Sequence, residues 1–259
     1  MKNYTIVPIE DYQKFEDFSK NRFFQTVFID EVILSHAIRF YNQYFRYIEH
    51  PIDREEALIY AKLGTCINSE FFRTIRPKNE EQLNQFYRLS PFHFFNNIIR
   101  FMDGMHRDMG FEFLERGKSP ILDFAGGTGG FSLFLAKKGL DVTFVESSII
   151  CLEWMKYITN ALGLKVAIHD SNDKLDRKFK LIIAKDVVEH VVDPGGLNDY
   201  LSSLLDVDGS VFSSVYPCCG PDEMAPMHFW VGYKDKNIEY SVEDNLAQLS
   251  GKTVSSNTM

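Results

Sequence analysis

The sequence predicts an α/β protein, a doubly wound and mostly parallel sheet with a helical N-terminal extension. Two observations carry this prediction. From residue 119 onwards, short apolar segments alternate with longer amphipathic ones, as expected for strands joined by crossover helices. Before residue 110, apolar residues recur near a spacing of 3.6, and Pro51 and Pro77 interrupt the pattern. We therefore expect a helical cap over residues 1–110, which shapes the substrate region, and an α/β domain over residues 111–259.

In the cap, helical periodicity is clearest over residues 30–47 and 54–67. Most of the 23 phenylalanines also lie in this part of the chain. Two interpretations of them stay open. They can form the core of the cap, or some of them can line an apolar or aromatic substrate pocket. No linker separates the two parts, so the cap is expected to pack directly on the second part.

The second part is expected to contain five strands, each a short apolar run bounded by turn residues, at residues 120–123, 141–145, 165–169, 179–184 and 209–216. Three helices are expected between them, at residues 130–138, 148–162 and 195–205. The first of these helices is well marked, because Lys137 and Lys138 lie in its last turn and Gly139 can end it. After Pro217, a hairpin within residues 228–241 and a short helix at 242–249 are weaker expectations.

Composition and charge exclude several classes of protein. The chain is 45% hydrophobic and 25% charged, as in a globular protein, and its net charge of −8 argues against a large nucleic-acid surface. It has no apolar run long enough to span a membrane, and no signal peptide is expected from its first residues. The four cysteines are not spaced as metal ligands or as a disulfide framework. We expect a cytoplasmic protein with no nucleic-acid or membrane partner. The oligomeric state stays open, with a homodimer as one alternative.

The strongest functional signal is the segment from Asp123 to Gly130. An apolar strand ends in Asp123, and four glycines follow within five residues before a helix begins: Gly126, Gly127, Gly129 and Gly130. Glycine permits positive φ and lets a ligand approach the backbone closely. A dinucleotide-binding loop would have a third glycine where Ser132 stands. The segment therefore indicates a cofactor loop, and the missing third glycine argues against a nicotinamide dinucleotide as the cofactor.

An acid at the end of the first strand, followed by Gly-Gly-Thr-Gly-Gly, resembles the first motif of class I S-adenosylmethionine-dependent methyltransferases. These proteins have a Rossmann-like sheet. The later motifs agree in order, because Glu146 ends the second expected strand, Asp170 follows the third, and Lys185 and Asp186 follow the fourth. The resemblance covers roughly residues 110–216. It implies an enzyme that uses S-adenosyl-L-methionine and releases S-adenosyl-L-homocysteine.

The resemblance also implies roles for these residues. Asp123 would hold the ammonium group of the cofactor, directly or through water. Glu146 would accept hydrogen bonds from both ribose hydroxyls, and Asp170 would meet the adenine amino group. The whole expected cofactor-binding set is Asp123, Ala125, Gly126, Gly127, Gly129, Glu146, Ser147, Asp170, Ser171 and Lys185.

The segment Asp186-Val187-Val188-Glu189-His190 resembles the D-x-x-E-H motif of a broad family of small-molecule methyltransferases. If Asp186 opens a helical turn, Glu189 and His190 lie on its face. Three interpretations stay open. His190 or Asp186 can act as a general base, or Glu189 and His190 can be structural. The third is a divalent metal held by Asp186, Glu189, His190 and His228, similar to small-RNA 2′-O-methyltransferases.

The metal interpretation is the weaker one, because the first position is Asp rather than Glu and the net charge disfavours RNA. The candidate catalytic residues are therefore Asp186, His190 and His228, with no metal expected. The expected reaction is in-line transfer of a methyl group to oxygen, nitrogen or carbon of a small metabolite, aromatic ones included. Two alternatives remain, a non-catalytic S-adenosylmethionine-binding scaffold and a nicotinamide-dependent oxidoreductase. The family's usual sixth and seventh strands have little room after Gly251.

Overall fold

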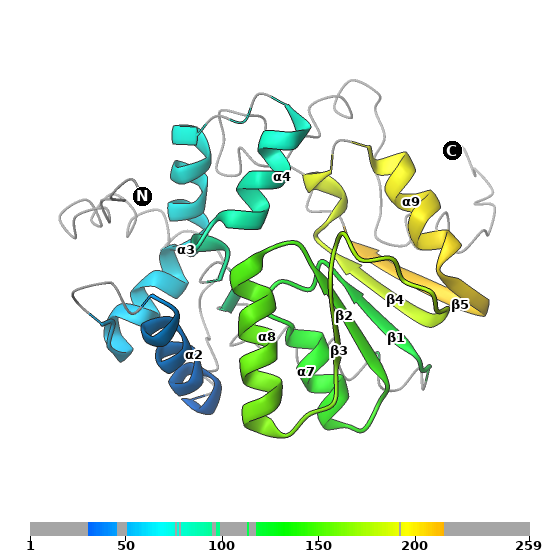
Figure 1. Cartoon of the computed structure of the whole chain (residues 1–259), viewed down its shortest axis with the longest axis horizontal. Helices are drawn as coiled ribbons and strands as arrows, with labels where there is room; N and C mark the ends of the chain where they lie inside the picture. Colours follow the sequence, from blue (N-terminus) through cyan, green and yellow to red (C-terminus); the bar gives the residue numbers. More distant parts are fainter. Residues whose placement is uncertain are drawn as a thin grey trace, which may run out of the picture.

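The computed structural model describes residues 31–45, 51–75, 77, 79–94, 97–98, 113, 118–191 and 193–214, and the structural statements below refer to these residues. The hairpin and helix expected after Pro217, and with them His228, lie outside the described residues. Figure 1 shows an α/β sheet with helices packed around it and three cap helices at one end.

The predicted parallel sheet is confirmed. Its five strands are β1 (Ile121–Phe124), β2 (Val142–Glu146), β3 (Ala167–Asp170), β4 (Phe179–Lys185) and β5 (Leu205–Ser214). They lie in the order β3-β2-β1-β4-β5, and every neighbouring pair is parallel. The chain therefore winds outwards in one direction from β1 to β3 and then returns to continue on the other side from β4. The connecting elements are α7 (Gly130–Lys137), α8 (Ile149–Leu162), the short 3₁₀ turn η2 (Val188–His190) and α9 (Pro194–Ser203).

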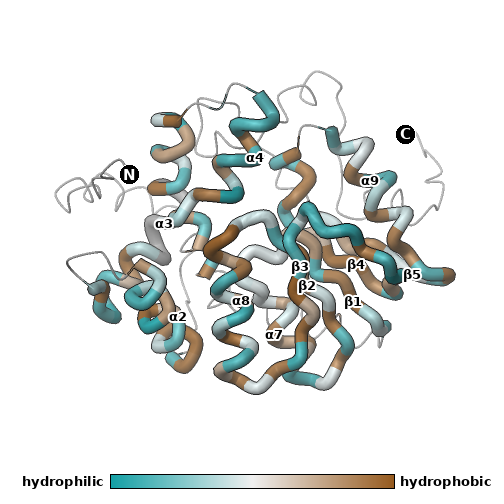
Figure 2. The backbone as a smooth tube through the Cα atoms, in the orientation of Figure 1, coloured by the Kyte–Doolittle hydropathy of each residue, from teal (hydrophilic) through white to brown (hydrophobic). Residues whose placement is uncertain are grey.

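Helices cover both faces of the sheet, because the strands are apolar on both sides. On one face, Ile121 and Leu181 pack in a cluster with Leu135 of α7. On the other face, Leu122 and its neighbours pack against Leu201 of α9. Figure 2 shows the same arrangement, with hydrophobic colour on the central strands and hydrophilic colour on the outer turns.

The cap contains α2 (Glu31–Tyr44), α3 (Arg54–Ile75) and α4 (Glu80–Leu89). Helix α3 extends well beyond the predicted residue 67. The polar pair Asn68 and Ser69 weakens the apolar pattern there, yet both residues are buried. Asn68 accepts a hydrogen bond of 2.9 Å from the hydroxyl of Ser90. A satisfied polar contact inside the cap therefore takes the place of an apolar one.

The cap and the sheet domain share one hydrophobic core. The ring of Phe40, in α2, lies 5.5 Å from that of Trp154 in α8, and the ring of Phe94 lies 5.3 Å from the same indole. Figure 1 shows α2 beside α8. The direct packing predicted from the absence of a linker is present in the structure.

Strand β5 begins earlier than predicted, at Leu205 instead of residue 209. The segment Asp206-Val207-Asp208-Gly209 has the composition of a turn. However, Leu205 is already paired with Phe179 of β4, and Asp206 forms a 3.2 Å ion pair with Lys180. The irregularity sits inside the strand, at Asp208, which has a φ of 61°. Within the described ranges, no helix is long and apolar enough to cross a membrane.

Candidate functional site

The candidate site lies where the winding of the sheet reverses, at the carboxyl ends of β1 and β4. These two strands are neighbours, but their following helices pack on opposite faces, which leaves a crevice between the loops. The residue after each strand has a left-handed backbone, with a φ of 53° for Ala125 and 52° for Asp186. This conformation is costly for a residue with a side chain, and such residues cluster at functional sites.

The glycine loop is packed so tightly that a side chain would not fit at Gly126, Gly127 or Gly129. Gly129 has a φ of 74°, and a Cβ atom there would lie 2.1 Å from the sulfur of Met155. Gly127 has a φ of 58°, and a Cβ atom would lie 2.8 Å from Cγ of Asn97. The loop is thus clamped between α8 and the segment around Asn97, and its backbone forms the floor of the crevice.

Glu146, the acid at the end of β2, binds the glycine loop and its own turn. Its Oε2 accepts a 2.7 Å hydrogen bond from the backbone N–H of Gly127. Its Oε1 accepts from the N–H groups of Ser147 at 2.7 Å and Ser148 at 2.9 Å. The carboxylate is 7% exposed. Burial raises the pKa of Glu146, and these hydrogen bonds oppose the rise.

Asp123, the acid at the end of β1, is buried beneath the loop. Its Oδ2 accepts hydrogen bonds from the backbone N–H of Ser132 at 3.1 Å and from the Ser132 hydroxyl at 2.7 Å. Asp123 therefore caps the first turn of α7. Burial raises the pKa of Asp123 to about 6, with a further rise from nearby Glu146, against the Ser132 hydrogen bonds. The expected contact with an ammonium group stays a prediction, and the capping role is one that the sequence analysis missed.

Asp170, the acid at the end of β3, is held by a cap residue. Nη1 of Arg88, in α4, lies 3.0 Å from Oδ1 and 2.8 Å from Oδ2 of Asp170. Oδ1 also accepts from the backbone and side-chain nitrogens of Asn172. Burial raises the pKa of Asp170, but the bonds from Asn172 and Arg88 outweigh it, so that the net pKa lies below its ordinary value. The neighbouring Ser171 donates its N–H to the carbonyl of Glu146 at 3.0 Å.

The turn after β4 differs from the sequence prediction. Asp186 does not open the helical turn, because its backbone is left-handed; the turn η2 starts at Val188. The Asp186 carboxylate pairs with the ammonium group of Lys185, and both side chains are nearly buried. Glu189 is 1% exposed and points into the protein instead of into the mouth of the crevice. His190 alone of the pair is partly accessible.

A residue of the cap also reaches His190. The hydroxyl oxygen of Tyr87, in α4, lies 2.9 Å from Nδ1 of His190. The Tyr87 ring is stacked on His93, with centroids 5.2 Å apart. Tyr87 and Arg88 are neighbours in sequence, yet they contact the loops after β4 and β3. Two further strands, β2 and β1, lie between these loops in the sheet, so the end of α4 spans the carboxyl edge above the glycine loop.

The metal interpretation finds no support in the described part of the chain, where no three His, Cys, Asp or Glu side chains are grouped to hold a metal ion. Asp186, Glu189 and His190 therefore do not form a ligand set by themselves. His228, the fourth candidate ligand, lies outside the described residues.

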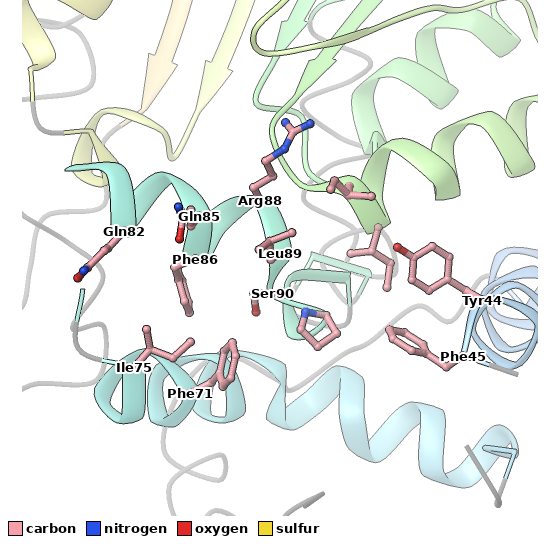
Figure 3. Close-up of a pocket in the computed structure, with 13 residues that line it drawn as sticks. Tyr44, Phe45, Phe71, Ile75, Gln82, Gln85, Phe86, Arg88, Leu89 and Ser90 are labelled. Atoms are coloured by element: carbon pink, nitrogen blue, oxygen red, sulfur yellow. The ribbon is translucent and has the colours of Figure 1, made fainter. Parts of the chain in front are cut away.

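A cavity of about 670 Å³ lies between the cap and the start of α8. Its aromatic lining comes from Tyr44, Phe45, Phe71 and Phe86. Figure 3 shows Phe71 below Phe86, Tyr44 and Phe45 across from them, and Arg88 pointing away from Phe71. Ile149 and Ile150, just after the Glu146 turn, also line it. Some of the cap phenylalanines thus line a pocket, while Phe40 and Phe94 belong to the core.

Comparison with known proteins decides the family. Residues 97–252, more than half of the chain, match a family model described as a methyltransferase domain. The chain belongs to this methyltransferase family. The methyltransferase resemblance inferred from the glycine loop and the strand-end acids is therefore confirmed. The detailed motif after β4 stays a prediction.

Solved methyltransferase structures are among the proteins to which the chain is similar. The CcbJ methyltransferase from Streptomyces caelestis is 21% identical, with a TM-score of 0.39, over 46% of this chain and 50% of that one. An S-adenosylmethionine-dependent methyltransferase from Clostridium acetobutylicum ATCC 824 is 24% identical, with a TM-score of 0.40, over 48% and 55% of the chains. The chain thus spans about half the length of these structures. No curated protein matches the chain.

Four residues of this candidate site were not predicted from the sequence: Tyr87, Arg88, Asn97 and Ser132. The first three belong to a helical segment with no recognisable motif. Ser132 was noted only as the position of a missing glycine. In the structure, the Ser132 hydroxyl donates a hydrogen bond to Asp123.

Proposed function

We propose that the protein is an enzyme that transfers a methyl group from S-adenosyl-L-methionine to an acceptor and releases S-adenosyl-L-homocysteine. The observation that carries this proposal is Glu146, a buried carboxylate that bonds to the glycine loop at the crevice beside β1. In a member of a methyltransferase family, an acid at the end of β2 is suited to the two hydroxyls of a ribose, because a carboxylate accepts two donors at once.

The residues of the crevice fit this cofactor. The loop at Gly127 and Gly129 excludes side chains, which leaves backbone for a methionine moiety to lie against. Asp170 and Ser171 would border the adenine, and Ser147 and Lys185 the ribose and methyl ends. When bound, the cofactor supplies an electrophilic methyl group on a sulfonium. The protein holds the acceptor in line with it, and orientation of this kind can lower a barrier by about 7–11 kcal/mol.

For an acceptor that must lose a proton, we propose His190 as the general base. Asp186 is less suited, because the adjacent Lys185 ammonium stabilises its carboxylate form and so weakens it as a base. His190 is partly accessible and is held at Nδ1 by Tyr87. In this role Tyr87 would accept a hydrogen bond from Nδ1–H, and Nε2 would be the nitrogen that takes the proton. His228 stays a further candidate from outside the described residues.

The acceptor is proposed to be a small apolar or aromatic metabolite. The aromatic cavity under the cap supports this substrate class, since ligand pockets are lined mainly by apolar side chains with few polar groups. The net charge of −8 supports a small molecule over a nucleic acid. No metal is required for such a transfer.

Calorimetry with S-adenosyl-L-homocysteine tests the cofactor assignment without knowledge of the acceptor. The unmodified protein should bind it, and Glu146→Gln, which keeps the shape but halves the acceptor capacity, should bind about tenfold or more weakly. Glu153→Gln is the matched control, because Glu153 forms an exposed ion pair with Lys156 within α8 and, in the described part of the chain, makes no hydrogen bond to the glycine loop. Equal binding by Glu146→Gln, or no binding by the unmodified protein, would overturn the assignment. Incubation with isotope-labelled methyl donor and candidate acceptors separates an enzyme from a protein that binds the cofactor without turnover.

A further inference from the structure

The ion pair between Arg88 and Asp170 joins the cap to the expected nucleobase end of the cofactor site. Arg88 lies near the end of α4 and Asp170 is the last residue of β3. The Arg88 side chain is 36% exposed and that of Asp170 24% exposed, and one guanidinium nitrogen lies within 3.0 Å of both carboxylate oxygens. The pair therefore fixes the direction of the carboxylate rather than merely adding to surface charge.

We propose that Arg88 is a positioning residue that holds Asp170 for recognition of an exocyclic amino group on the nucleobase. This inference rests on the proposed function, in which Asp170 borders the adenine. It adds a residue of the cap to the determinants of cofactor specificity.

The hydrogen bonds at Asp170 leave one oxygen with free capacity. Oδ1 accepts from Arg88, from the N–H of Asn172 and from the side-chain nitrogen of Asn172. Among the described residues, Oδ2 accepts from Arg88 alone. A carboxylate oxygen has two lone pairs, so Oδ2 can accept one more donor. An amino group supplies that donor, whereas a carbonyl oxygen at the same position would meet a negative charge.

Arg88 and Asn172 also keep this carboxylate ionised. Their hydrogen bonds outweigh the effect of burial and hold the pKa of Asp170 below its ordinary value. An ionised carboxylate only accepts hydrogen bonds and never donates one. Without Arg88, Asn172 would still hold Oδ1. Oδ2 would lose its contact with the guanidinium, and its position would be less well fixed.

The test compares two ligands whose bases differ at the 6-position and in the hydrogen on the adjacent N1. S-adenosyl-L-homocysteine carries the 6-amino group, and S-inosyl-L-homocysteine carries an oxo group instead. Calorimetry on the full chain should show that the unmodified protein prefers the adenosyl ligand. Arg88→Met should bind the adenosyl ligand about three- to tenfold more weakly, with a smaller preference between the two ligands. Arg88→Lys, which keeps the charge, should restore most of the affinity.

Arg177→Met is the matched control. Arg177 forms a similarly close ion pair with Asp141, at 2.6 Å. These two residues precede β4 and β2, so they lie at the amino ends of the strands, away from Asp170. This variant should leave both affinities unchanged. The double variant Arg88→Met with Asp170→Asn should lose no more selectivity than Asp170→Asn alone, because the two residues act together.

Two results would overturn the inference. One is unchanged affinity in Arg88→Met. The other is an equal loss of affinity for both ligands, which would mean that Arg88 lines the site without acting on the amino group. If Arg88→Met has a much lower melting temperature than the unmodified protein, the affinities of Arg88→Gln and Arg88→Lys for the two ligands are compared instead. Failure of the unmodified protein to bind either ligand would contradict the proposed function instead.

Discussion

Tyr87 and His190 meet at 2.9 Å, hydroxyl oxygen to Nδ1, across 103 positions of sequence. Burial raises the pKa of the Tyr87 phenol well above its ordinary value, and the charge of Glu189 adds to the rise. The phenol is therefore neutral at and well above neutral pH. A neutral hydroxyl at Nδ1 fixes the orientation of the imidazole, and with it the direction of Nε2.

Tyr87→Phe should remove the contact at Nδ1 of His190 while keeping the stack on His93. The loss of one partly buried hydrogen bond should lower the free energy of unfolding by about 1 kcal/mol. In ¹⁵N-labelled protein, the imidazole resonances of His190 should show a changed balance of tautomers, and once an acceptor is known the pH profile of methyl transfer should shift. Tyr157→Phe is the control, since its hydroxyl lies 3.3 Å from Nδ1 of His36, away from the crevice. Unchanged His190 resonances in Tyr87→Phe would contradict the positioning role.

Gly129→Ala should destabilise the protein more than Gly139→Ala. Both glycines have positive φ, 74° and 83°, so the backbone strain of an added side chain is similar. At Gly129, however, the new Cβ would overlap the sulfur of Met155, whereas at Gly139 no atom lies within 4 Å. Thermal or urea unfolding should give a loss of about 1 kcal/mol for Gly139→Ala and about 2–4 kcal/mol for Gly129→Ala. Equal losses would show that the loop is not clamped by α8.

Asp123→Asn should reduce the pH dependence of stability. The native pKa of about 6 lies above the ordinary value of 3.8, so between these values the folded protein keeps a proton that the unfolded chain has released. The contribution of Asp123 to stability therefore falls as pH rises from about 4 to 6, by about 3 kcal/mol for a shift of about two units. Asn keeps an oxygen for Ser132 and does not titrate. Urea unfolding at pH 4 and pH 6.5 should show a smaller drop for Asp123→Asn, and parallel curves would argue against a buried titrating Asp123.

Phe40→Ala should destabilise the cap and the sheet domain together. The Phe40 ring is 5% exposed and contacts Phe94 and Trp154 in the shared core. Its loss should lower the free energy of unfolding by about 3–5 kcal/mol, with a single cooperative transition by tryptophan fluorescence and circular dichroism. Val32→Ala, on the same helix but 59% exposed, should change little. A separate early transition in Phe40→Ala would show that the cap unfolds on its own.

The sheet was predictable from the sequence because each of its strands is a local apolar run. The strands alternate with helices along the chain, and this alternation favours parallel pairing. Strand β4, predicted to within one residue at Lys185, illustrates this. The 3₁₀ turn after it was less predictable, because the left-handed backbone of Asp186 depends on how the crevice closes around it. The predicted helix ended too early, at residue 67, because Asn68 looks like a surface residue in the sequence. Asn68 is buried only because Ser90, 22 positions away, donates a hydrogen bond to it.

The kind of site, a cofactor loop with acids at the strand ends, could be predicted from the sequence alone. Glycines at Gly127 and Gly129 and acids at the ends of β1, β2 and β3 lie close together because parallel strands bring their carboxyl ends to one edge. The partners of those acids in the folded chain depend on tertiary packing. Asp123 caps α7 through Ser132, and Asp170 is held by Arg88, 82 residues earlier in the chain. Such contacts depend on where a distant helix packs, and no local pattern of residues encodes that position.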